Sequence, residues 1–167
     1  MKAYLDIETS FGGEITIVGI FCPPGRVIQL IGDEVNWTNL WNSLDGVATI
    51  VTYNGDRFDL PKIKKSVGLD LKKYFASQDL LYSCHRQNLY GGLKKVEEQL
   101  GIERNTKGVD GFAAMRLWEQ FCRFADEGSL KVLLEYNRED AVNLYHLEAC
   151  LARTGKKNGG ARKNLTP

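Results

Sequence analysis

The chain has 167 residues, of which 43% are hydrophobic and 26% are charged, and its formal net charge is +1. This length and composition suffice to bury a core in one domain, which excludes a predominantly disordered protein. No apolar run reaches the roughly 20 residues that a membrane-spanning helix needs, and Asp6 comes too early for a signal-peptide core. We therefore expect a cytoplasmic protein that binds no membrane.

The first third of the chain is predicted to form three strands. Short runs of β-branched and aromatic residues cover residues 2–7, 15–21 and 26–31, and glycines and prolines separate them. Connections this short favour an antiparallel meander. The four cysteines, at positions 22, 84, 122 and 150, show no spacing typical of zinc ligands, so we expect small, buried side chains in a reducing compartment.

Strand and helix patterns alternate in the rest of the chain. The order predicts an α/β fold, in which the meander leads by a parallel crossover into a mixed sheet flanked by helices. The pattern predicts strands at 47–53 and, more briefly, at 79–82, and helices at 36–43, 60–67, 93–100, 112–124 and 130–151.

Residues 153–167 differ in composition from the rest of the chain. They contain five basic residues, no acid and three glycines, which leaves 17 basic and 21 acidic residues for residues 1–152. We predict one domain over residues 1–152 and a basic, flexible tail over 153–167. The tail could be a solvated terminus without a role, or it could attract phosphate groups.

Acidic residues interrupt elements that otherwise look buried. In the first strand, Asp6 and Glu8 project from the same face, which could also be the solvent side of an edge strand. In the last helix Asp140 lies on the apolar stripe one turn after Tyr136. A buried carboxylate needs a cation, a hydrogen-bond network or a metal, so Asp140 is a candidate site residue. The alternative is an aspartate that pairs with a nearby Lys or Arg, or with backbone amides at a helix end.

The segment of residues 54–59 follows the apolar strand predicted at 47–53. Open α/β sheets place their sites at the carboxyl ends of such strands, which makes Asp59 a fourth candidate. The alternative is a turn in which Asp59 caps the next helix and faces solvent. Four clustered carboxylates would suit two hard divalent cations, Mg²⁺ or Mn²⁺.

These residues resemble a known set of motifs. Asp6-x-Glu8, Asn54-Gly55-x-x-Phe58-Asp59 and Tyr136-x-x-x-Asp140 resemble the three motifs of the DEDD superfamily of 3′-to-5′ exonucleases, in the branch with a tyrosine before the last aspartate (DEDDy). Residues 1–151 are also similar to a predicted exonuclease family, with related stretches at residues 93–102 and 136–140.

The resemblance implies a ribonuclease H-like fold with about five strands, the second of them antiparallel. It implies that Asp6, Glu8, Asp59 and Asp140 bind two divalent cations, Mg²⁺ or Mn²⁺. One ion would activate water, and the other would stabilise the leaving 3′ oxygen. Tyr136 would position the attacking water, since a phenol with a pKa of about 10 is a poor base at neutral pH.

The implied substrates are the 3′ ends of single-stranded DNA or RNA, and the products are nucleoside 5′-monophosphates. Thr9 and Ser10 could line the pocket of the terminal nucleotide, and Asn54 and Phe58 are further candidate substrate contacts. Asp79 and Asp110 are better explained by a strand end and a turn. Lys94 and Lys95 open a helix and could meet phosphate or simply face solvent.

Two alternatives remain open at the level of sequence. The same fold could serve as a nucleic-acid-binding or adaptor module without catalysis, although the presence of all four acids and the tyrosine counts against this. It could also be an endonuclease of the ribonuclease H or junction-resolving kind, and Tyr136 four residues before Asp140 favours the exonuclease.

Overall fold

A five-stranded mixed sheet with the order β3-β2-β1-β4-β5 forms the centre of the molecule. The computed structural model describes residues 1–160 and the side chains of residues 1–154. β1 (Lys2–Thr9), β2 (Ile15–Cys22) and β3 (Arg26–Ile31) form an antiparallel meander. β4 (Thr49–Thr52) pairs parallel to β1, and β5 (Ala76–Asp79) pairs parallel to β4. The predicted α/β fold with a mixed sheet is confirmed.

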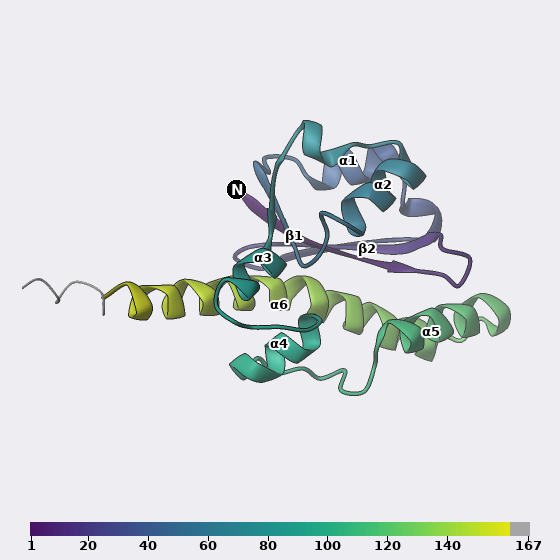
Figure 1. Ribbon diagram of the computed structural model, residues 1–167. Coiled ribbons are helices and arrows are strands. Elements are labelled where there is room, and N and C mark those ends of the chain that lie inside the picture. Colours follow the sequence, from purple (N-terminus) through teal and green to yellow (C-terminus); the bar gives the residue numbers. More distant parts are fainter. Residues whose placement is uncertain (161–167) are drawn as a thin grey trace, which may run out of the picture.

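Helices cover both faces of this sheet (Figure 1). One face carries α1 (Trp37–Ser43) and α2 (Asp59–Val67), and two 3₁₀ turns, Gly32–Glu34 and Leu71–Lys73, lie in the connections. The other four helices lie on the opposite side, where the longest runs beneath the strands. They are α3 (Leu80–His85), α4 (Leu93–Leu100), α5 (Gly111–Phe124) and α6 (Glu127–Gly160).

The alternation of side chains along β1 places the acids on the face that α6 covers. Leu5 and Ile7 pack in the core shared with α1 and α2, whereas Tyr4 packs in the core shared with α6. Asp6 and Glu8 share the face of Tyr4. Since β1 lies between β2 and β4, the alternative of an edge strand with a solvent face is wrong.

Helix α6 buries the predicted stripe against the sheet. Its buried residues include Leu133, Tyr136, Asp140, Leu144, Leu147 and Leu151, as the three- and four-residue spacing predicts. The helix begins earlier than expected and continues to Gly160, so it includes the first part of the segment predicted as a tail. The rest of that segment, residues 161–167, lies outside the described residues.

Two expectations about local structure were wrong. The segment of residues 79–82 does not form the last strand: β5 ends at Asp79, whose carboxylate accepts a hydrogen bond from the Leu81 amide (3.0 Å) and so starts α3. Nor are all cysteines buried. Cys22 and Cys84 are, but Cys122 is exposed on α5.

None of the described helices combines the length and the apolar character needed to cross a bilayer.

Candidate metal centre

Three of the four predicted carboxylates converge between β1 and α6. Asp6, Glu8 and Asp140 each present an oxygen within 4.8 Å of those of the other two. Glu8 and Asp140 are buried, while Asp6 stays partly exposed. The strand contributes two acids because alternate residues share a face, and α6 contributes the third from its buried stripe.

Asp59 lies next to this group but outside it. It is the first residue of α2, is only 6% exposed, and its Oδ1 accepts a hydrogen bond from the Ile7 amide (3.2 Å). The alternative in which Asp59 caps a helix and faces solvent is therefore wrong, since Phe58 takes the cap position. Its charge raises the pKa of both Asp6 and Glu8, so it belongs to the same electrostatic site.

The carboxylates of this site resist ionisation. Loss of hydration, followed by repulsion from Asp140, raises the pKa of Asp6 and of Glu8. Burial raises the pKa of Asp59 to about 7. Such repulsion is relieved by a divalent cation, and the donors are all carboxylate oxygens, the ligands that Mg²⁺ and Mn²⁺ prefer. The residues present thus fit a hard divalent cation.

Tyr136 lies beside the carboxylates on the same face of α6. It is buried, and this loss of hydration, together with the charges of Asp140 and Glu8, raises its pKa. The phenol therefore stays neutral at physiological pH. Lys94, from the first turn of α4, donates a hydrogen bond to the Tyr136 hydroxyl and lies 4.2 Å from the ring centroid. Lys94 is thus directed into the site and not to solvent.

Asn137 supports the first acid, a role for which sequence reasoning gave no signal beyond its place in the 136–140 stretch. Its Nδ2 donates to Asp6 Oδ2 (3.1 Å), and its Oδ1 accepts from Gln29 on β3 (3.0 Å). The side chain is completely buried over Gly19, which pairs with Asp6 across β1 and β2. A Cβ at Gly19 would overlap the Asn137 amide, so this approach requires glycine.

We expect Gly19→Ala to lower the free energy of unfolding by about 1–3 kcal/mol, because the added methyl overpacks a site that Asn137 already fills. Urea unfolding measures this effect. Gly25→Ala is the matched control, since nothing lies within 4 Å of a Cβ there. Equal stability of the two variants would contradict the proposed packing.

Arg104 enters the site from the loop after α4, and sequence reasoning missed it. Its side chain, 8% exposed, forms ion pairs with Asp140 and with Glu97, whose carboxylate lies 2.5 Å from Arg104 Nε. Glu139 fixes the following loop by accepting hydrogen bonds from the amides of Asn105 (2.6 Å) and Thr106 (3.0 Å). The sequence signals were the alternative in which a nearby Lys or Arg pairs with Asp140, which this ion pair confirms, and the family-like stretch of residues 93–102, which contains Glu97.

The loop between β4 and α2 is held by Asp79. The Asp79 carboxylate accepts hydrogen bonds from the amides of Asn54 (2.7 Å) and Asp56 (3.2 Å). Asn54 adopts a left-handed conformation (φ +60°) and is exposed, and Gly55 lies too close to Thr52 for any side chain. Asp79 therefore supports the loop that leads to Asp59.

The predicted substrate contacts lie around the carboxyl end of β1. Thr9 ends the strand, and the Ser10 hydroxyl accepts a hydrogen bond from the Glu14 amide (3.2 Å) in the turn that follows. Phe58 is exposed, with Lys62 Nζ 5.4 Å from its ring centroid. Asp110 caps α5 by accepting from the Ala113 amide (2.8 Å), in agreement with its structural interpretation.

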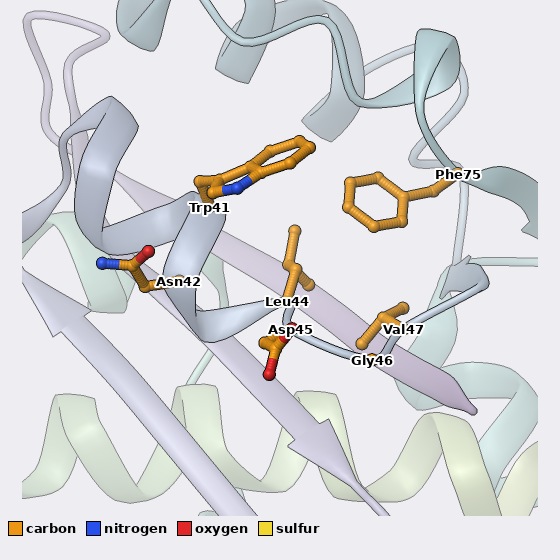
Figure 2. A pocket seen from close by; sticks show the side chains of 7 residues that line it. All are labelled: Trp41, Asn42, Leu44, Asp45, Gly46, Val47 and Phe75. Carbon is orange, nitrogen blue, oxygen red and sulfur yellow. The ribbon is translucent and has the colours of Figure 1, made fainter.

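A cavity of about 480 Å³ lies apart from the carboxylates. Figure 2 shows Trp41 and Phe75 facing each other across it, with Leu44 and Val47 beneath them. It is formed by the end of α1 and the turn before β4, at the amino end of that strand. None of the predicted site residues lines it, so it offers no pocket for the chemistry of the carboxylates.

Comparisons with known proteins cover most of the chain. A family model described as "RNase_H superfamily" matches residues 3–152. The uncharacterized protein YprB of Bacillus subtilis (strain 168) is 30% identical over 126 residues, which are 70% of this chain and 30% of YprB. The family B DNA polymerase from the hyperthermophilic archaeon Pyrobaculum calidifontis superposes on 87% of this chain with a TM-score of 0.61 and 16% identity. This chain corresponds to 24% of that polymerase chain, and the likeness shows the fold alone.

Proposed function

The chain belongs to the RNase H superfamily, and on this basis we propose that it is a metal-dependent 3′-to-5′ exonuclease. It would hydrolyse the phosphodiester bonds of single-stranded DNA or RNA from the 3′ end and release nucleoside 5′-monophosphates. The observation that carries this proposal is the convergence of Asp6, Glu8 and Asp140 beside Tyr136. Clustered carboxylates whose pKa values are raised by burial and by one another are typical of functional sites.

Asp6, Glu8 and Asp140 would hold one Mg²⁺ or Mn²⁺ ion, and Asp59 would contribute to a second. When bound, such ions supply Lewis acidity that activates water and stabilises the leaving 3′ oxygen. Asn137 keeps the Asp6 carboxylate aimed at the site through its 3.1 Å hydrogen bond. Tyr136, held neutral by its raised pKa, orients the attacking water through its hydroxyl and does not act as the base.

Exposed aromatic side chains near the site suit unpaired bases. Phe58 precedes Asp59, and Phe11, just beyond the end of β1, lies 5.5 Å from Phe112 between ring centroids. Bases that are free of a partner strand can stack on such rings, whereas paired bases in a duplex cannot reach them. Thr9, Ser10 and Asn54 would line the same end of β1 and contact the terminal nucleotide.

Membership of the RNase H superfamily supports a nucleic-acid substrate in general terms. The Pyrobaculum protein, a DNA polymerase, shares the fold with this chain. Because this chain corresponds to only 24% of that polymerase and 30% of YprB, we transfer no activity of either whole protein. We propose that residues 1–152 form the nuclease domain and that the basic residues of 153–167 add phosphate contacts that weaken with salt.

Digestion of 5′-labelled single-stranded DNA and RNA in Mg²⁺, Mn²⁺ or EDTA tests this proposal. We expect a ladder of products that shorten by one nucleotide from the 3′ end in the presence of metal, and no products in EDTA. Circular single strands serve as the control, because they have no end. Cleavage of the circles would indicate an endonuclease, and nucleic-acid binding without any product in either metal would indicate the adaptor alternative.

A further inference from the structure

The guanidinium of Arg104 lies inside the acidic site. Its Nη2 forms an ion pair with Asp140, one of the three converging carboxylates. The side chain is almost fully buried, so this positive charge is part of the site and not of its rim. The charges of Arg104 and Lys94 oppose the rise in the Asp140 pKa that burial causes. In the absence of metal, the protein thus supplies its own cations to its carboxylates.

Glu97 anchors this cation independently of the site. Its carboxylate is 1% exposed and accepts hydrogen bonds from Arg104 Nε (2.5 Å) and Nη2 (3.2 Å). No other donor reaches Glu97 among residues 1–154. Glu97 therefore keeps Arg104 next to the carboxylates even when the contact with Asp140 is broken.

Arg104 and a divalent cation would need the same carboxylate. Asp140 has to offer an oxygen to any ion held by Asp6 and Glu8. The carboxylate of Asp140, however, already forms an ion pair with the guanidinium of Arg104. Arg104 cannot relieve the conflict by losing a proton, because guanidinium stays charged at all accessible pH values. Two cations on one buried carboxylate repel each other strongly. The Nη1 atom of Arg104 is buried without a hydrogen-bond partner among the described residues, so little besides Glu97 and Asp140 holds the group in place.

We propose that Arg104 is an internal counter-cation, which holds the carboxylate site together without metal and which a divalent cation displaces from Asp140. The proposal rests on the metal site of the proposed function and adds a competitor that sets the affinity of that site. The proposal predicts the direction in which the metal affinity changes when Arg104 is replaced. Removal of the charge of Arg104 strengthens metal binding, whereas a residue that merely positions Asp140 for the metal would weaken binding when removed.

Calorimetric titration of the metal-free protein with Mn²⁺, without nucleic acid, tests this sign. We expect Arg104→Gln to bind Mn²⁺ about tenfold more tightly than the wild type at low salt. The melting temperature of the metal-free variant should be lower than that of the wild type, because Glu97 and Asp140 lose their partner. Addition of Mn²⁺ should raise the melting temperature of the variant by more than that of the wild type. Arg104→Lys keeps the charge and should stay near the wild-type affinity.

Lys2→Gln is the matched control. Lys2 also pairs with a carboxylate of α6, Glu148 (2.5 Å), but at the other end of β1, so its loss should leave Mn²⁺ affinity unchanged.

If Arg104→Gln does not fold, the double variant Arg104→Gln/Glu97→Gln removes both buried charges and should also bind Mn²⁺ more tightly than the wild type. Equal or weaker binding by the folded variant, or no binding by any variant, would overturn the proposal. Tighter binding by a protein that degrades no 3′ ends would support it and refute the exonuclease.

Discussion

Asp6→Asn is expected to reduce nucleotide release by about 10³-fold or more, the largest effect on activity that the site predicts. Asp6 lies among the other acids of the site, since Asp140, Glu8 and Asp59 each raise its pKa. An amide at this position offers a neutral oxygen where a bound divalent cation would need a charged carboxylate. Release of nucleoside monophosphates from 5′-labelled single strands, followed over time in saturating Mn²⁺, measures the loss.

The fold should survive this substitution. The amide oxygen of an asparagine can still accept the hydrogen bond from Asn137, and removal of one charge relieves repulsion among the carboxylates. We therefore expect a metal-free melting temperature equal to or above that of the wild type. Asp33→Asn removes an exposed acid from the turn after β3 and should leave activity unchanged. Retention of activity by Asp6→Asn in saturating metal would exclude the proposed centre.

Without metal, stability should fall as pH rises, by about 2 kcal/mol between about pH 5 and pH 7. The pKa of Asp59 rises from 3.8 to about 7 upon folding, and those of Asp6 and Glu8 also rise. In this window the folded protein binds more protons than the unfolded chain, so each rise in pH favours the unfolded state. Acids whose pKa is lowered by folding, such as Asp56 and Glu148, change the free energy of unfolding only at lower pH.

Urea unfolding in EDTA at several pH values measures this slope, and Mn²⁺ should reverse it. Metal binds the ionised carboxylates, so the stabilisation by Mn²⁺ grows as pH rises. Asp59→Asn should flatten the slope in EDTA, because it removes the group with a pKa of about 7. A stability that rises with pH in EDTA would show that the carboxylates are not strained by burial and repulsion.

Much of the fold could be predicted because the spacing of apolar residues along a short segment indicates whether that segment forms a strand or a helix. The meander, the parallel crossover and the buried stripe of α6 all follow from spacing along the chain, and membership of the RNase H superfamily agrees with the ribonuclease H-like fold expected from the motifs. The error at residues 79–82 has a local cause as well. An apolar run of three residues fits a strand and a helix equally well. The side chain of Asp79 caps the first turn and so favours the helix.

The acids of the site could be found from sequence because charges on apolar stripes are conspicuous. Their partners could not, since polar residues on loops and helix faces look alike until the chain is folded. Asn137 fits above Gly19 and contacts Asp6, 131 positions away, and Arg104 pairs with Asp140, 36 positions away. Both are contacts between elements that lie far apart in the sequence. Whether Asp59 completes a second cation position remains a prediction.

The contact between Asn137 and Asp6 joins residues 131 positions apart. As a chain emerges from the ribosome, β1 is therefore made long before the helix that completes its acidic face. Until α6 arrives, Asp6 and Glu8 stay hydrated and far from Asp140, so neither the repulsion nor the cation site exists. The acidic face of β1 is therefore completed only once α6 has been made, and the carboxylate cluster that we propose to hold metal cannot form on a nascent chain that ends before α6.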